Sequence, residues 1–343
     1  MELGGNGEKV IDSARPPASR RLPIELHHGL RLQGTPLWMD ATRPQPLSFV
    51  SHAHGDHFAR HKRIICSAPT ARLIGHKVHQ AALEVHPHRE PFALDHLRLE
   101  LFSAGHMLGS SQLLIESAGQ RIVYTGDFKL RPSLTAEPAD IMPCDLLVME
   151  CTFGKPQYRF PDRDALVRQL VSFIEHAIEE RQVPVLFVYQ MGKGPEIAKL
   201  LNDLGYAVML SSQIHTVVER YRDLGITFPR CEVMNGGNYY GKVLLMPPYL
   251  KNSPALTRLP RRRTAVLTGW AIDADARYRY GADEAIPFSD HADFDELLEY
   301  VRQANPSRIL TVHGPPEFAA HLRTLGYRAH HLEHRAQLSL WDD

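Results

Sequence analysis

One segment of the chain is dense in metal-binding side chains. Ser51-His52-Ala53-His54-Gly55-Asp56-His57 forms an H-x-H-x-D-H pattern directly after the apolar run at residues 47–50. Three imidazoles and one carboxylate in a single loop can supply ligands to two metal centres, and this donor set suits zinc, with manganese and iron as competitors. The alternative is a surface histidine cluster without a metal. It is disfavoured because chance produces the pattern in only roughly four such chains in a thousand.

Three further candidates follow predicted strands. Asp40 ends Leu-Trp-Met-Asp, His106 lies in Ser-Ala-Gly-His, and Asp127 ends Tyr-Thr-Gly-Asp. The ends of strands are where α/β and β-sandwich enzymes place their chemistry. The sequence therefore predicts a site assembled from several strand ends.

This ordered set resembles the metallo-β-lactamase superfamily, which implies an αββα sandwich with a dinuclear metal site at one edge of its sheets. Glu150 in Val-Met-Glu, His291 in Ser-Asp-His and His313 in Thr-Val-His narrow the resemblance to the β-CASP nucleases. That group includes RNase J and Artemis-like DNA nucleases. The segment 152–161 is most similar to the bacterial ligase-associated DNA exonucleases, and the wider resemblance extends over about residues 25–335.

The resemblance implies a role for each matching residue. One metal ion would be held by His52, His54 and His106, and the other by Asp56, His57 and His313. Asp127 would bridge the two ions, and Asp40 would orient the metal-binding loop from behind the ligands, as physical reasoning also expects. Glu150 and His291 would lie beside the scissile phosphate. The expected catalytic residues are Asp56, Asp127, Glu150 and His291.

These roles predict hydrolysis of phosphodiester bonds by a metal-activated hydroxide. Two divalent ions, zinc or alternatively manganese, would lower the pKa of a water between them and stabilise charge on the phosphate. His291, with its pKa raised by Glu150, would protonate the departing oxygen. The sequence contains no G-x-S-x-G serine motif, so a covalent serine nucleophile is not expected.

The expected substrate is nucleic acid, with DNA favoured over RNA, and the expected activity is that of a DNA exonuclease in repair. His313 favours the RNase J-like branch, because relatives on the Artemis side have an apolar residue there. An RNase J-like ribonuclease of RNA processing is therefore the alternative. A small-molecule metallo-hydrolase is disfavoured by an insertion of about 125 residues, and a non-catalytic subunit by the complete ligand set. A DNA ligase and a helicase are candidate partners.

Short β-like runs dominate the first 150 residues, and strands are expected at residues 47–50, 97–102, 112–115, 121–124 and 146–149. Residues 70–83 have the spacing of a helix. Beyond residue 161, strands and helices alternate, which is typical of a parallel sheet with helical crossovers. The expected helices are 164–180, 195–204, 214–224, 294–302 and 316–325, and the expected strands are 183–189, 206–210, 266–269 and 308–312.

The predicted fold class is α/β, a metallo-β-lactamase αββα sandwich with an inserted β-CASP α/β domain. The expected divisions are a flexible tail at 1–22, the first part of the sandwich at 23–157, the insertion at 158–284 and the return segment at 285–343.

Composition narrows the remaining possibilities. The 343 residues include 39 basic and 39 acidic side chains, and this zero net charge excludes a uniformly basic, histone-like grip on nucleic acid. Four cysteines without C-x-x-C spacing predict reduced thiols. No run reaches the roughly 18 to 20 apolar residues of a membrane span, and the first residues lack a signal-peptide core. A cytoplasmic protein without membrane contact is expected.

Two weaker features suggest contacts to a nucleic acid. Lys193 and Gly194 follow a predicted strand and open a predicted helix, so they are candidates for binding a phosphate, although an ordinary tight turn explains the pattern equally well. Four aromatic residues are candidates for stacking on single-stranded bases or for packing in the core: Tyr158, Phe160, Tyr239 and Tyr240.

Overall fold

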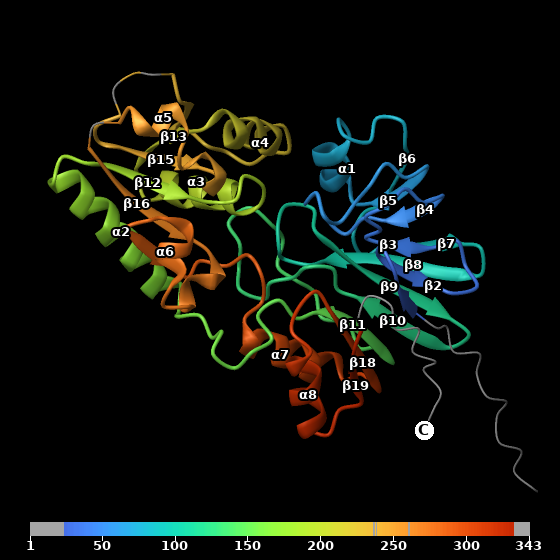
Figure 1. Ribbon diagram of the computed structural model, residues 1–343. Helices are drawn as coiled ribbons and strands as arrows, with labels where there is room; N and C mark the ends of the chain where they lie inside the picture. Colours follow the sequence, from blue (N-terminus) through green and yellow to red (C-terminus); the bar gives the residue numbers. More distant parts are fainter. Residues whose placement is uncertain (1–23, 236, 238, 260, 333–343) are drawn as a thin grey trace, which may run out of the picture.

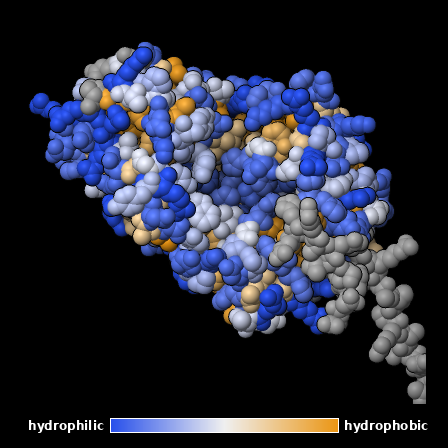
Figure 2. All heavy atoms as spheres, in the orientation of Figure 1, coloured by the Kyte–Doolittle hydropathy of each residue, from blue (hydrophilic) through white to orange (hydrophobic). Residues whose placement is uncertain are grey.

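The computed structural model describes residues 24–235, 237, 239–259 and 261–332. The predicted tail at residues 1–22 and the end of the predicted return segment lie outside this range. The described chain forms two lobes, a β-sandwich and an α/β unit (Figure 1). The space-filling view shows a hollow between them (Figure 2).

Two sheets face each other in the sandwich. The first runs in chain order: β1 (Ile24–Leu26), β2 (Leu30–Leu32), β3 (Trp38–Met39), β4 (Leu47–Phe49), β5 (Arg63–Cys66) and β6 (Ala82–Val85). The second has the order β19 (Ala329–His331), β18 (Arg308–Val312), β11 (Leu146–Glu150), β10 (Gln120–Tyr124), β9 (Ser111–Ser117), β8 (Leu97–Ser103) and β7 (Pro91–Leu94). Strand β8 alternates buried and more exposed residues, as a strand with one core face should. Side chains such as Phe49 from the first sheet and Leu99 from the second form one buried cluster.

Helices cover both outer faces of the sandwich. Helix α1 (Ala68–Ile74) packs Leu73 against Ile64 of the first sheet. On the second sheet, α7 (Phe294–Ala304) and α8 (Glu317–Thr324) pack Leu297 and Leu322 against Leu147. The layers are therefore helix, sheet, sheet and helix, and the predicted αββα fold class is confirmed.

The second lobe contains a parallel sheet with the order β14 (Cys231–Val233), β13 (Ala207–Leu210), β15 (Lys242–Met246), β12 (Val183–Phe187), β16 (Arg262–Leu267) and β17 (Glu284–Ile286). Its helices are α2 (Arg163–Glu179), α3 (Lys193–Asp203), α4 (Ser212–Asp223), α5 (Pro254–Thr257) and α6 (Ala276–Tyr280), with 3₁₀ turns η1 (Pro248–Leu250) and η2 (Gly269–Ile272). Strand β12 is buried throughout because the sheet is covered on both faces.

The predicted strands and helices match the observed ones to within a few residues, with one exception. The helix predicted at 70–83 is wrong, because α1 ends at Ile74 and residues 82–85 form β6, which pairs in parallel with β5. Gly75 caps α1 with its N–H bonded to Ala71, and pairing within the sheet then outweighs the helical spacing. The predicted domain boundaries stay a prediction, and the second lobe spans residues 163–286.

The topology brings several carboxyl ends of strands to one edge of the sandwich. Strands β10, β11 and β18 run parallel, and β8 shares their direction because β9 is antiparallel to both β8 and β10. In the facing sheet, β3 and β4 are parallel neighbours. Among the described residues, no helix is both long and apolar enough to cross a membrane.

Asp293 caps helix α7 and holds two neighbouring loop segments to it, so its removal should weaken the sandwich. Its buried carboxylate caps α7 through the N–H groups of Asp295 and Glu296, and it also accepts from Arg131 and Phe160. Asp293→Ala should lower the free energy of unfolding by about 2–4 kcal/mol, because a cap is lost and buried donors are left unpaired. Urea denaturation measures this loss.

Asp295→Ala is the matched control, two residues further along the same helix. Its carboxylate is exposed and, among the described residues, pairs with exposed Arg159, so this substitution should cost under about 1 kcal/mol. Equal losses for the two variants would show that Asp293 has no special role at the start of α7.

Candidate metal centre

Three imidazoles converge at the carboxyl edge of the sandwich. His52 Nε2 lies 3.0 Å from His54 Nδ1, which lies 3.1 Å from His106 Nε2. A tetrahedral zinc ion with bonds of about 2.0–2.1 Å places its ligand nitrogens roughly 3.3 Å apart. The three nitrogens and a carboxylate oxygen of Asp127 lie within 4.8 Å of one another. The donor types and spacing therefore fit a metal ion.

The second ring nitrogen of each imidazole has its own partner. His52 Nδ1 lies 2.9 Å from the hydroxyl of Ser51, and His106 Nδ1 lies 2.7 Å from the carbonyl oxygen of Asp290. His54 Nε2 lies 3.3 Å from the carbonyl oxygen of Met191, which belongs to the other lobe. Such partners orient ligand rings and raise their basicity.

Burial keeps these imidazoles in the neutral form that binds metals. It lowers the pKa of His52 well below its ordinary value, and it also lowers the pKa of His54. For His106, burial and the neighbouring imidazoles lower the pKa to about 3. Neutral imidazole nitrogens keep the lone pair that a metal ion requires.

Asp127 lies between this triad and His57. Its Oδ2 is 3.5 Å from His52 Nε2, 4.0 Å from His106 Nε2 and 3.3 Å from His57 Nε2. Burial would raise the pKa of Asp127, but the imidazoles of His57 and His291 hold it well below its ordinary value. Asp127 therefore lies between the triad and His57, and its bridging of two metal ions stays a prediction.

Asp40 supports the loop from behind. Its buried carboxylate accepts from the Ser51 N–H at 2.7 Å, the Ser51 hydroxyl at 2.5 Å and the Tyr124 hydroxyl at 2.8 Å. His57 Nδ1 lies 2.8 Å from the same carboxylate, which leaves Nε2 to face Asp127. Asp40 has a φ of 47°, a left-handed conformation that is unusual outside glycine and consistent with a constrained site.

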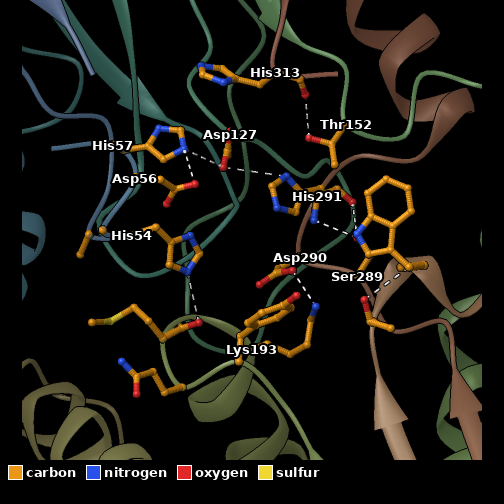
Figure 3. A pocket seen from close by; sticks show the side chains of 18 of the residues that line it. His54, Asp56, His57, Asp127, Thr152, Lys193, Ser289, Asp290, His291 and His313 are labelled. Carbon is orange, nitrogen blue, oxygen red and sulfur yellow. Dashed lines mark hydrogen bonds and ion pairs between the residues drawn. The ribbon is translucent and has the colours of Figure 1, made fainter. Parts of the chain in front are cut away.

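The remaining predicted ligands are more loosely placed. The Asp56 side chain is 82% exposed, and its Oδ2 lies 3.9 Å from His57 Nε2. The His313 ring lies 5.4 Å from that of His57 between centroids, and His313 lines the same cavity. Figure 3 shows His54, Asp56, His57 and Asp127 around one space, with His313 beyond them. The second set of ligands therefore stays a prediction.

Glu150 and His291 form a pair on the other side of Asp127. Glu150 is buried and accepts from the Phe128 N–H at 2.9 Å, and His291 Nδ1 lies 3.0 Å from its Oε1. Burial would lower the pKa of His291, but Glu150 and Asp127 raise it to about 9. The imidazole is thus held in its protonated form at neutral pH, with Nδ1 directed at Glu150.

Glycines precede two of these residues where no other side chain fits. Gly105, before His106, has a φ of 72°, and a Cβ there would lie 2.3 Å from the carbonyl oxygen of Lys129. Gly126, before Asp127, has a φ of 55°, and its Cβ would lie 2.7 Å from the Ser51 side chain. The backbone therefore packs more closely behind the ligands than an alanine would allow.

The site forms the floor of a cavity of about 430 Å³ between the two lobes. The sandwich supplies residues such as His54 and Asp127, and the second lobe supplies Tyr189, Gln190 and Trp270. Such a volume is typical of a ligand-binding cleft. Figure 2 shows polar residues gathered in this hollow.

Lys193 and Gly194, the predicted phosphate contacts, already have partners. Buried Lys193 lines the cavity, and its Nζ lies 2.8 Å from Asp290 Oδ1 (Figure 3). The Gly194 N–H donates to the Tyr189 carbonyl oxygen at 2.8 Å. Phosphate binding by Lys193 and Gly194 stays a prediction. It would require Lys193 to leave Asp290 and the Gly194 N–H to leave the Tyr189 carbonyl.

Sequence reasoning missed several groups that orient the site. Asp290 precedes the predicted His291, so the Ser-Asp-His triplet was the available signal. No sequence signal pointed to the carbonyl of Met191 or to the buried pair of Lys129 with Glu196, 3.0 Å apart. These contacts depend on the packing of the lobes. Tyr158 and Phe160, two of the predicted stacking candidates, instead pack with Phe153 in a buried cluster.

Comparisons with known proteins agree with this geometry. Residues 28–185 match a family model described as a beta-lactamase superfamily domain. Residues 283–336 match a model described as a Zn-dependent metallo-hydrolase RNA specificity domain. Together the two segments cover more than half of the chain. The chain belongs to the metallo-β-lactamase superfamily and to its β-CASP nuclease group.

Individual relatives are named for both DNA and RNA. The chain is 40% identical to a "Probable DNA ligase" of Opitutus terrae, over 92% of this chain and 32% of that protein. An "RNase J-like protein" of Methanocaldococcus jannaschii is 27% identical over 77% and 80% of the two chains. The "5' exonuclease Apollo" of Gallus gallus is 26% identical over 83% and 63%. The chain thus spans about a third of the Opitutus protein.

A solved structure shares the fold. A protein of unknown function from Enterococcus faecalis aligns with a TM-score of 0.54 at 15% identity, over 78% of this chain and 75% of that one. At this identity the likeness concerns the fold alone.

Asp40→Asn should weaken metal binding while leaving every predicted ligand in place. The two carboxylate oxygens of Asp40 contact four polar groups, whereas an asparagine side chain has a single oxygen. Its NH2 group would then face a hydrogen-bond donor, and this clash would displace Ser51 or His57. A loss of about 10- to 100-fold in zinc affinity is expected. Competition with a chromogenic chelator measures it.

Tyr124→Phe is the matched control, because it removes one of the four contacts to Asp40 and keeps the carboxylate. It should weaken zinc binding less than Asp40→Asn does. Wild-type affinity in Asp40→Asn would rule out an orienting role for this carboxylate.

Proposed function

We propose that the protein is a metal-dependent DNA exonuclease that hydrolyses phosphodiester bonds, with a role in DNA repair. The observation that carries this proposal is the convergence of His52, His54 and His106 with Asp127 at the cleft between the lobes, which His54 and Asp127 line directly. Membership of a nuclease group of metallo-hydrolases supports it.

The residues that would hold metal line the cavity or are buried beside it. His52, His54 and His106 would hold one ion, His57, Asp56 and His313 a second, and Asp127 would contact both. Bound zinc or manganese would lower the pKa of a coordinated water and offset the negative charge of the phosphate. The proposal of two ions rests on Asp127, whose Oδ2 faces His52 on one side and His57 on the other.

The chain's own acid for the leaving group is His291. Because Nδ1 is directed at Glu150, Nε2 is the nitrogen free to donate a proton to the departing sugar oxygen. Glu150 is fixed in turn by the Phe128 N–H and the Thr152 hydroxyl, so the pair is rigid on the cleft wall. A positioned acid of this kind contributes about 10²–10⁴-fold to a rate.

Two observations bear on the choice of nucleic acid. The name of the Opitutus relative favours DNA and also supports a DNA ligase as a partner, and the name of the Gallus relative supports an exonuclease. The match to an RNA specificity domain and the presence of His313 in the cavity favour the second candidate, an RNase J-like ribonuclease. A helicase partner and a cytoplasmic location stay predictions.

Digestion of matched DNA and RNA tests the substrate. End-labelled strands of one sequence, single- and double-stranded, should be incubated with zinc or manganese. We expect faster release of terminal nucleotides from DNA and none after chelation. Faster cleavage of RNA would select the ribonuclease, and internal cuts alone would contradict an exonuclease.

His291→Ala should show a loss that depends on the leaving group. A nucleotide leaves as a basic alkoxide that needs a proton, so oligonucleotide turnover should fall by about 10²–10⁴-fold. Bis(p-nitrophenyl) phosphate releases an acidic phenol, so the loss there should be much smaller. Asp127→Ala, which removes a metal contact, should impair both substrates. Equal losses of His291→Ala on both substrates would argue against a proton donor.

A further inference from the structure

The second lobe presents three aromatic side chains toward the cleft. Tyr189 follows β12, Tyr249 follows β15 and Trp270 follows β16. These strands are parallel neighbours, with Phe187 paired to Met246 on one side and to Val266 on the other. Their carboxyl ends lie about 4.8 Å apart, so the three residues leave adjacent positions on one edge of the sheet.

This edge faces the metal centre. Tyr189 and Trp270 line the same cavity as His54, Asp127 and His291. The Tyr249 hydroxyl donates to Gln190 Oε1 at 3.2 Å, and Gln190 lines the cavity too. Tyr189 and Trp270 therefore form part of the cleft wall beside the proposed site of hydrolysis, and Tyr249 adjoins that wall through Gln190.

Core packing explains neither tyrosine. Tyr189 is 48% exposed and Tyr249 is 67% exposed. By contrast, Phe153, Tyr158 and Phe160 fill the buried cluster beneath Trp270. Exposed aromatic rings beside a cleft are typical of a binding surface.

The three rings are held in place before any ligand arrives. Trp270 packs on Phe153 with ring centroids 4.7 Å apart and on Tyr158 at 5.3 Å. The Tyr249 hydroxyl is held by Gln190, and that of Tyr189 by Tyr280. Little side-chain entropy is lost when a flat ligand stacks on a ring that is already fixed.

We propose that Tyr189, Tyr249 and Trp270 form a stacking row for the unpaired bases next to the scissile phosphate. The bases of a single strand have free faces that can stack on such rings, whereas paired bases are already stacked within a duplex. Exposed Lys77 of the sandwich lines the same cavity and supplies positive charge for the backbone. The row therefore selects single-stranded nucleic acid, and this inference rests on the proposed nuclease function.

Binding tests the row independently of turnover. A fluorescein-labelled dT12 strand is titrated by anisotropy into full-length protein in a His291→Ala background with metal present. Tyr189→Ala and Tyr249→Ala should each weaken binding by about tenfold, and Tyr189→Phe and Tyr249→Phe should restore most of it because they keep the ring. Tyr206→Ala is the control, because Tyr206 precedes β13 at the opposite edge of the same sheet.

An abasic strand separates stacking from a general structural effect. Removing the bases at the three positions beside the cleaved bond should weaken binding to the parent protein about as much as the tyrosine substitutions do. The Tyr189→Ala Tyr249→Ala double variant should bind the intact and the abasic strands equally. The same comparison with U12 tells whether the row also accepts RNA.

The outcomes for the row and for the nuclease are distinct. Two results would overturn the stacking row: equal losses of affinity in the alanine and phenylalanine variants, or an unchanged affinity for the abasic strand. Cleavage of DNA by the wild type would still support the nuclease in that case. Ring-dependent binding without any hydrolysis by the wild type would support the row and reject the nuclease. Tighter binding of a blunt duplex than of dT12 would also reject the row.

Discussion

One buried carboxylate oxygen determines the arrangement of the site. Asp127 Oδ2 lies between 3.3 and 4.0 Å from nitrogens of four imidazoles, those of His57, His52, His106 and His291. Neutral imidazoles that direct lone pairs at one another from about 3 Å repel. A cation among the nitrogens of His52, His54 and His106 relieves this repulsion, so the donor set is best understood as a metal site.

The second lobe is part of this site as well as a cover for it. The turn after β12 places the Met191 carbonyl on His54 and the Lys193 ammonium on Asp290, whose own carbonyl holds His106. The buried pair of Lys129 and Glu196 joins the lobes nearby. Because the same turn carries Tyr189, a movement of the lobes that changed the width of the cleft would also change the support of two imidazoles.

The sequence predicted most of the strands and helices for reasons that are local, and the roles of the predicted site residues stay predictions. Strand and helix periodicity survives in single segments, and the density of His and Asp at strand ends is visible without a structure. The helix predicted through residue 83 was wrong because residues 82–85 pair with β5, a separate segment of the chain. The spacing within residues 70–83 does not reveal that pairing. The carbonyl of Met191 and the Lys193–Asp290 pair were invisible for the same reason, since a backbone oxygen has no residue type and an ion pair across lobes has no spacing.

The zero net charge of the chain acquires a different meaning at this cleft. Asp127, Glu150 and Asp290 place carboxylates where a polyanion would bind, and the nearby cations His291 and Lys193 are engaged with Glu150 and Asp290. The positive charge that attracts a phosphodiester must then come largely from bound cations, which the formal count omits. In the proposed nuclease, binding of metal and binding of the strand would thereby be linked, because each would raise the affinity for the other by the same factor.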